Sequence, residues 1–199
     1  MQSALNERMI DFWHWFRDAA TPEKAQDPEF LKALDDRISE LSPQLSWEIG
    51  PGFSQPWRFV ISPNLDHHLR ETAREIIARA PVLPGWEFYS TRQPKEWNYQ
   101  VELIGNNGNP IYLDASNWTF VLLRYPDATH EILLKGQNLP ELEDDERWQA
   151  AAITLESILG EDLMMDRINE FELVENLGSE FANKDRPIQQ LRNAIVGKG

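Results

Sequence analysis

The chain has 199 residues, of which 41% are hydrophobic, and its formal net charge at pH 7 is −14. This composition suffices for a buried core, and the absence of cysteine excludes a disulfide framework, a thiol nucleophile and a cysteine-ligated metal. The negative charge disfavours binding to nucleic acid. No apolar run approaches the roughly 18 residues of a membrane span, and we expect no secretory signal, so a cytoplasmic protein is predicted.

Residues 1–44 are predicted to form two amphipathic helices. Apolar residues recur at helical spacing from Ser3 to Ala20, and a proline directly after this stretch ends the pattern. The second helix begins at Asp27-Pro28, where an N-cap residue precedes a proline at the first helical position. We expect this N-terminal helical pair to pack on a larger element.

Residues 45–92 follow the order strand, strand, helix, strand. Apolar side chains alternate at strand period in LSWEIG (45–50) and in WRFVIS (57–62). An amphipathic helix follows at 64–80, and the prolines and the glycine after it predict a stop and a turn. The aromatic stretch at 86–91 alternates again and completes a ββαβ unit.

A meander of strands is predicted next. YQVELIG (99–105) and PIYLD (110–114) flank an Asn-Asn-Gly-Asn turn, which favours a hairpin because asparagine and glycine tolerate positive φ. NWTFVLLRY (117–125) and THEILLK (129–135) flank a Pro-Asp pair that suits a type I turn. Since 120–123 is apolar on both faces, a second layer must cover it, and the N-terminal helices are the natural candidates.

The last part of the chain, residues 136–199, is acidic and mainly helical by its pattern. A helix is expected at 144–159, with Trp148 on its apolar face and acidic residues in its first turn, where the helix dipole favours them. The stretch INEFELV at 168–174 fits either a strand or a continued helix, and we favour the strand. A last helix is expected near 187–196.

These elements predict a single domain over residues 1–199, made of an N-terminal helical pair (1–44), a ββαβ unit with a meander (45–135) and an acidic helical part (136–199). The expected fold is α+β, a mainly antiparallel sheet of about six to eight strands covered by helices. A ferredoxin-like element is one option for the ββαβ unit, and the strand order is left open.

No catalytic or metal-binding motif stands out. His67 and His68 are adjacent and project about 100° apart on a helix, so they cannot converge on one ion, and the other two histidines lack a metal-ligand spacing. The acidic pairs at 141–146 lack the spacing and the glycine of a calcium loop. No nucleophile elbow and no phosphate-binding loop is present. We expect no metal and no cofactor and lean against an enzyme, although carboxylates that meet only in the fold stay open.

The negative charge is concentrated in one region. Residues 141–185 hold fourteen Asp and Glu against three Lys and Arg, a net charge of −11, and the other 154 residues sum to −3. Solubility alone explains such a surface, whereas the sharper hypothesis is an acidic face that attracts a basic protein, with a few exposed aromatic side chains as anchors. The predicted partner-binding residues are Glu141, Glu143, Asp144, Asp145, Glu146, Trp97 and Tyr99, with Tyr112 as a further exposed aromatic.

The segment 64–95 carries a pattern of capping and packing residues, in which a helix ends at Ala-Pro and a short turn leads to an aromatic strand. The pattern consists of Leu69, Ile76, Ile77, Ala80, Pro81, Pro84, Gly85, Trp86, Glu87, Phe88, Tyr89 and Arg92. It resembles a pattern in an uncharacterised bacterial family of the domain-of-unknown-function type. The resemblance implies a small cytosolic α+β domain, and it supplies no catalytic residue.

The leading functional hypothesis is a non-enzymatic cytosolic binding or regulatory protein that engages a basic protein through its acidic surface, a toxin-neutralising protein being one form. The first alternative is an enzyme of unrecognised type, with a carboxylate or histidine cleft lined by aromatic side chains. The second is a structural domain that forms homo-oligomers. The three predict different observations, namely salt-sensitive binding, a pocket with convergent polar groups, or self-association.

Overall fold

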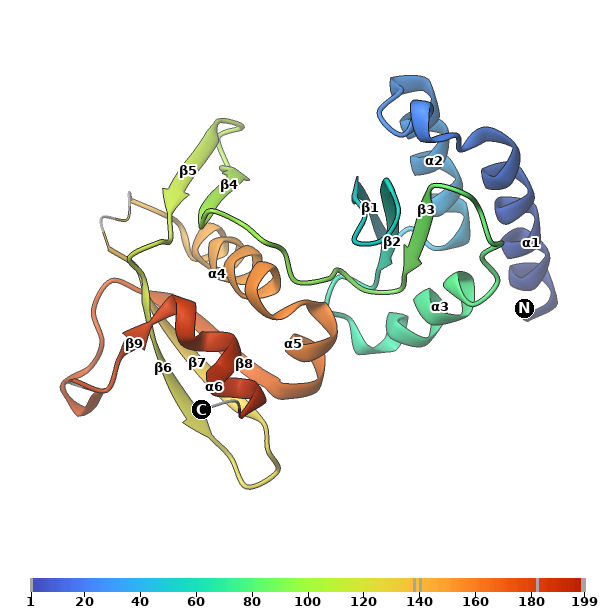
Figure 1. Cartoon of the computed structure of the whole chain (residues 1–199). Coiled ribbons are helices and arrows are strands. Elements are labelled where there is room, and N and C mark those ends of the chain that lie inside the picture. The colour runs from blue at the N-terminus through green and yellow to red at the C-terminus, as the bar shows by residue number, and fades with distance from the viewer. Residues whose placement is uncertain (1, 138, 140, 182, 198–199) are drawn as a thin grey trace. The chain divides into compact units, whose positions relative to one another are not determined.

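The computed structural model describes residues 2–137, 139, 141–181 and 183–197. The chain forms two compact units, Met1–Arg92 and Gln93–Gly199 (Figure 1). The boundary falls inside residues 45–135, which the sequence pattern treats as one part. That the whole chain unfolds as one domain stays a prediction.

The predicted α+β fold is confirmed by the elements of both units. Those of the first unit are α1 (Gln2–Ala19), η1 (Pro22–Lys24), α2 (Pro28–Leu41), β1 (Ser46–Pro51), β2 (Trp57–Ser62), α3 (His67–Ile77) and β3 (Trp86–Tyr89). Those of the second are β4 (Gln100–Ile104), β5 (Pro110–Asp114), β6 (Thr119–Arg124), β7 (His130–Lys135), α4 (Asp144–Leu159), α5 (Glu161–Arg167), β8 (Ile168–Val174), η2 (Ser179–Phe181), β9 (Arg186–Pro187), η3 (Ile188–Gln190) and α6 (Leu191–Val196). In the described part of the chain, none of the helices combines the length and the apolar character that a membrane crossing needs.

The first unit contains the predicted ββαβ unit as a three-stranded sheet. Its strand order is β1-β2-β3, with β1 and β2 antiparallel and β2 and β3 parallel. Helix α3 makes the crossover, and its N-cap Asp66 accepts a hydrogen bond from the backbone N–H of His68 at 2.8 Å. Because β2 and β3 are direct neighbours, the unit has no strand between them, and the ferredoxin-like option is not realised.

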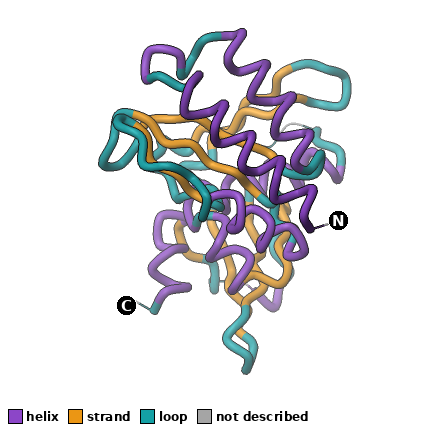
Figure 2. Tube along the Cα trace, turned by 90° about the vertical axis from the view of Figure 1, so that its right-hand side faces the viewer, coloured by secondary structure: helices purple, strands orange, loops and turns teal. Residues whose placement is uncertain are grey.

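An aromatic core joins this sheet to the N-terminal helices, which lie side by side in both views (Figures 1 and 2). Phe59 of β2 is fully buried, and its ring centroid lies 5.0 Å from that of Phe16 and 6.2 Å from that of Trp13 on α1. The helices therefore pack on the sheet of the first unit, whereas the sequence pattern made them the natural candidates to cover the apolar run at 120–123. Strand β2 and the apolar run at 120–123 are both rich in apolar residues. A hydrophobic pattern shows that a face of a strand is buried, but it does not show which helix buries that face.

The second unit has two sheets. Strands β4 and β5 form a hairpin, and the larger sheet has the order β8-β7-β6-β9, in which β7 and β8 are parallel and the other pairs antiparallel. The strand predicted at 168–174 is confirmed as β8. Helix α4 contacts both β4 and β8 (Figure 1). The described strands thus form three sheets in place of the single predicted sheet, because alternation gives the face of a strand but not its pairing partner.

Candidate functional site

A hollow of about 760 Å³ opens in the second unit, where the turn of the β4–β5 hairpin meets the start of α4. Its walls combine carboxylates with amide and aromatic side chains. The hairpin contributes Asn106, Asn107 and Tyr112, the segment before α4 contributes Glu141 and the N-cap Glu143, and the first turn of α4 contributes Glu146. The fold therefore brings three of the predicted partner-binding residues together and adds Tyr112 to them.

The β4–β5 hairpin has one buried face and one exposed face. Its alternate inward side chains, Val101, Leu103 and Leu113, are buried, and β4 contacts α4. The outward side chains are all exposed, and they form the cross-strand pairs Gln100–Asp114, Glu102–Tyr112 and Ile104–Pro110. The exposed face thus mixes acidic side chains with an aromatic ring and apolar groups.

The predicted turn between these strands is confirmed, and α4 holds it in place. Gly108 adopts a φ of 80°, which glycine tolerates, and the Gly105 N–H donates to the Asn109 carbonyl at 2.8 Å. The Asn106 backbone N–H donates to Oε1 of Glu146 at 2.9 Å. Oε2 of Glu146 accepts the backbone N–H of Glu143, also at 2.9 Å, as part of a capping box at the start of α4.

Glu146 therefore has a structural role, which distinguishes it from the other acidic residues predicted for the site. It is only 6% exposed, and both of its carboxylate oxygens already accept hydrogen bonds inside the protein. The sequence placed it on an exposed acidic surface, because nothing in its neighbourhood reveals a partner forty positions earlier. It lines the hollow while holding the hairpin turn to the helix.

The remaining acidic residues are on the surface. Glu141, Glu143, Asp144 and Asp145 are exposed, and none of the four forms an ion pair with a basic residue in the described ranges. Asp145 accepts a hydrogen bond from the Asn106 side-chain amide at 3.1 Å. Of these four, Glu141 and Glu143 line the hollow, and no described basic residue compensates their charge there.

The sequence did not predict the exposure of two apolar side chains on the second unit. Ile104 is 60% exposed, and Trp148 is 53% exposed, with its ring centroid 5.6 Å from that of Phe171. The sequence placed Trp148 on the buried face of α4, but that face is centred on Ala150, Ala151 and Leu155. Alternation along β4, which sets Ile104 in phase with Glu102, is the signal that could have found the first of them.

Trp97 and Tyr99 lie outside the hollow. Both are partly buried, and their rings meet edge to face with centroids 5.3 Å apart. The Tyr99 carbonyl accepts the backbone N–H of Ala115 at 2.8 Å, next to the end of β5. Their position suits packing beside the hairpin, and they do not line the hollow with the acidic residues.

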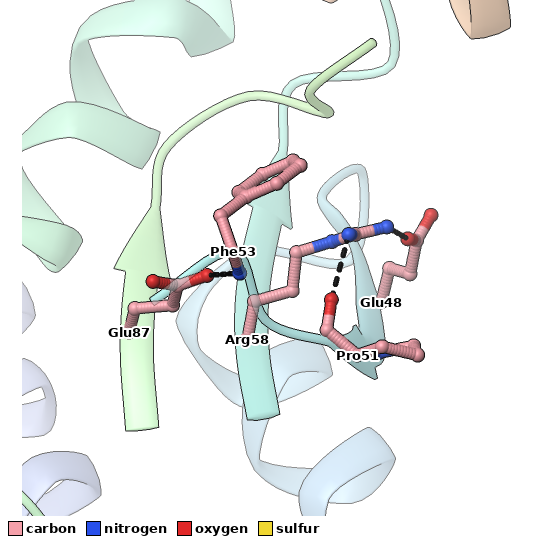
Figure 3. Close-up of polar contacts among 5 residues, drawn as sticks. All are labelled: Glu48, Pro51, Phe53, Arg58 and Glu87. Carbon is pink, nitrogen blue, oxygen red and sulfur yellow. Dashed lines mark hydrogen bonds and ion pairs between the residues drawn. The ribbon is translucent and has the colours of Figure 1, made fainter. Parts of the chain in front are cut away.

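A second polar cluster lies in the first unit and is built around Arg58, which is 8% exposed (Figure 3). Its guanidinium donates to the Pro51 carbonyl at 2.8 Å and to Oε1 of Glu48 at 2.9 Å. The Phe53 ring lies over the guanidinium, 5.1 Å from centroid to Cζ. These contacts fix the 51–56 loop against the sheet.

Glu87, which neighbours Arg58 in the sheet, holds the same loop from β3. Its carboxylate accepts the Ser54 hydroxyl at 2.7 Å and the Ser54 N–H at 3.1 Å. It also accepts the Phe53 N–H, as Figure 3 shows. Partial burial raises the pKa of Glu87, but the hydrogen bonds from Ser54 and the loop backbone together outweigh it and lower the pKa. Burial and the Glu87 charge raise the pKa of Tyr89 on the same face. The Glu87 carboxylate thus stabilises the 51–56 loop of its own unit.

The histidines do not gather in one place. His14, His67 and His68 are exposed, and His130 is buried in β7, where burial and two neighbouring arginines lower its pKa. No histidine lines the hollow. Among the residues that the structure describes, no group of three or more His, Asp or Glu side chains is placed to hold a metal ion.

Comparison with known proteins gives no match: no family model, no curated protein and no solved structure is similar to this chain. The resemblance of segment 64–95 to a bacterial family therefore stays a prediction.

Proposed function

We propose that the chain is a non-enzymatic binding protein, which engages a basic segment of a partner protein at the hollow of the second unit. One observation carries this proposal: exposed carboxylates of Glu141 and Glu143 share the walls of the hollow with Tyr112, which is 68% exposed. A lysine or arginine side chain suits such walls, because the carboxylates attract its charge and the aromatic face attracts a cation.

A protein partner is favoured over a small cation by exposed apolar side chains on the same unit. Ile104, which pairs across the hairpin with the hollow-lining Pro110, and Trp148 on α4 are both more than half exposed, and tryptophan is among the residues that contribute most of the binding energy at protein interfaces. A second copy of this chain would be a poor occupant of the hollow, since its own acidic surface would be repelled. Size-exclusion chromatography measures whether the chain self-associates elsewhere.

The charge of the second unit supports the same partner. Residues 93–199 hold nineteen acidic and nine basic residues, a net charge of −10, whereas residues 1–92 have a net charge of −4. A surface of one sign speeds the association of an oppositely charged partner and loses that advantage as salt screens it. Binding should therefore weaken as the ionic strength rises.

The test uses peptides, since the natural partner is unidentified. A random peptide library is selected on the full chain and counter-selected on the Glu141→Gln/Glu143→Gln/Tyr112→Ala variant. Enriched peptides should carry Lys or Arg beside an apolar residue, and their affinity should fall by about tenfold or more between about 0.05 and about 0.5 M NaCl. Enrichment of neutral peptides whose affinity does not respond to salt would overturn the proposal.

The basic partner could be a toxin that the chain neutralises, and co-expression with a basic toxin encoded by a neighbouring gene would test this. We propose the cytoplasm as the compartment, since a chain without cysteine needs no oxidising environment. Membership of the bacterial family that segment 64–95 resembles would add no catalytic residue, so it agrees with a binding role.

A further inference from the structure

A groove of about 260 Å³ lies in the first unit, between one face of α1 and the segment that follows α3. Ile10, Trp13, His14 and Arg17 line it from α1 at helical spacing, and Arg79 and Pro81 line it from the other side. Its volume is just below the roughly 300–1,000 Å³ of pockets for drug-sized ligands, so it fits a smaller molecule.

The floor of the groove is apolar. Trp13 is 3% exposed, and its indole N–H already donates to the Ile76 carbonyl at 2.7 Å, so the indole has no hydrogen-bond donor left for a ligand. Ile10, which is 42% exposed, and Pro81 also line the groove. A ring or a short hydrocarbon chain would find apolar contact here.

The rim of the groove is cationic, which is unusual in a chain of net charge −14. Arg79 is held in place, since Nε donates to the Asn6 side chain at 3.1 Å and Nη1 donates to the Glu75 carbonyl at 2.5 Å. Arg17 is half exposed, and its Nε forms an ion pair with the exposed Asp18 at 3.1 Å. His14 also lines the groove, and none of the described lining residues is acidic.

We infer that this groove binds a small organic anion with an apolar body, such as a carboxylate on an aromatic ring or a short alkyl chain. The two guanidinium groups recognise the carboxylate, and Ile10, Trp13 and Pro81 hold the apolar body. The site is separate from the acidic hollow in residues and in sign of charge, and it does not depend on the proposed function.

Isothermal titration of the full chain with 4-phenylbutanoate tests the inference. The wild type should bind with a Kd of about 1 mM or tighter, and the neutral amide and acetate should each bind about tenfold more weakly or not at all. The Arg17→Gln/Arg79→Gln variant should lose about tenfold in affinity, whereas Lys32→Gln, which removes an exposed charge on α2, should bind as the wild type does.

Two further variants keep the test decisive. Ile10→Trp retains both arginines but fills the groove, so it should abolish binding. If the double variant fails to fold, Arg17→Gln alone, which alters an exposed residue, should still weaken binding by a few fold. The inference is overturned if the wild type does not bind, if the amide binds as well as the acid, or if removal of the arginines leaves the affinity unchanged.

Discussion

In the first unit the hairpin β1–β2 leads through α3 into β3, and in the second unit the hairpin β6–β7 leads through α4 and α5 into β8. In both, the last strand pairs parallel with the second strand of the hairpin. The two units therefore share a ββαβ connectivity without a sequence repeat. Their additions differ: two helices precede the first hairpin, whereas a second hairpin, β4–β5, precedes the other.

The two units also use their carboxylates differently. In the first, Glu48 pairs with a buried arginine and Glu87 accepts hydrogen bonds from a loop, so these charges stabilise the unit itself. In the second, Glu141 and Glu143 form no ion pair with a described basic residue and stand beside exposed apolar side chains. Carboxylates that are paired or hydrogen-bonded within a unit stabilise that unit. Carboxylates that line a hollow without a described basic partner are available to bind a basic group of another protein.

The largest expected effect is on the cores. Phe59→Ala should destabilise the protein by about 4 kcal/mol and Leu134→Ala by about 3 kcal/mol, because each side chain is 0% exposed. If the chain is one cooperative domain, its urea unfolding shows a single transition, and each variant lowers the urea concentration at the midpoint of that transition. Circular dichroism and tryptophan fluorescence monitor the unfolding. Separate transitions, each shifted by one variant only, would contradict the single-domain prediction and would show that the units fold independently.

A smaller loss is expected when the polar cluster of the first unit is cut. Arg58→Met should cost about 2 kcal/mol, because the guanidinium donates to Glu48 and to the Pro51 carbonyl in a nearly buried position. Urea unfolding measures the loss. Lys32→Met serves as the control, since it removes an exposed ion pair and should change stability by less than about 0.5 kcal/mol. Equal effects of the two variants would mean that the cluster does not stabilise the fold.

Charge reversal at the hollow should weaken binding, and it should also lower stability by about 1 kcal/mol, because Glu143→Lys removes the N-cap carboxylate of α4. Glu141→Lys/Glu143→Lys should lower the affinity for a selected basic peptide by about tenfold or more, equivalent to about 1.4 kcal/mol of binding free energy, mainly at low salt. Asp11→Lys/Glu40→Lys makes the same change of net charge on exposed residues of the first unit. If this control weakens binding as much, total charge governs the affinity and the hollow does not.

Local patterns in the sequence were enough to predict most of the elements. Alternation placed β2, the N-cap Asp27 accepts the expected backbone N–H groups at the start of α2, and the Asn-Asn-Gly-Asn turn closes the β4–β5 hairpin. Each of these features depends on residues that lie within a few positions of one another. The α+β class followed from them.

Features that join distant positions could not be predicted. Glu146 is buried because a turn forty residues earlier donates to it, and Arg58 is buried because a loop folds back over its sheet. Trp148 is exposed because α4 turns a narrower face to the sheets than its apolar residues suggested. The acidic hollow combines both cases: its residue types are visible in the sequence, while their meeting with Tyr112 depends on how the hairpin packs on α4.

The smallest expected effect is a pH dependence in the first unit. The pKa of Glu87 is lowered in the folded protein, so its stabilisation is complete above the pKa of the unfolded chain and is lost as the pH falls through the folded-state pKa. Glu87→Gln should therefore be less stable than the wild type by about 1 kcal/mol at neutral pH, and this difference should shrink as the pH is lowered to about 3. Urea unfolding at the two pH values measures the difference.

Ser54→Ala makes this prediction specific, because it removes one hydrogen bond and keeps the carboxylate. Its loss at neutral pH should be smaller than that of Glu87→Gln, and it should shrink in the same direction as the pH falls. If the difference in the free energy of unfolding between the wild type and Glu87→Gln increased at acidic pH, the fold would stabilise the protonated form of the Glu87 carboxyl. In that case the first unit, like the second, would contain a carboxylate that its own contacts do not stabilise, and the contrast between the two units would weaken.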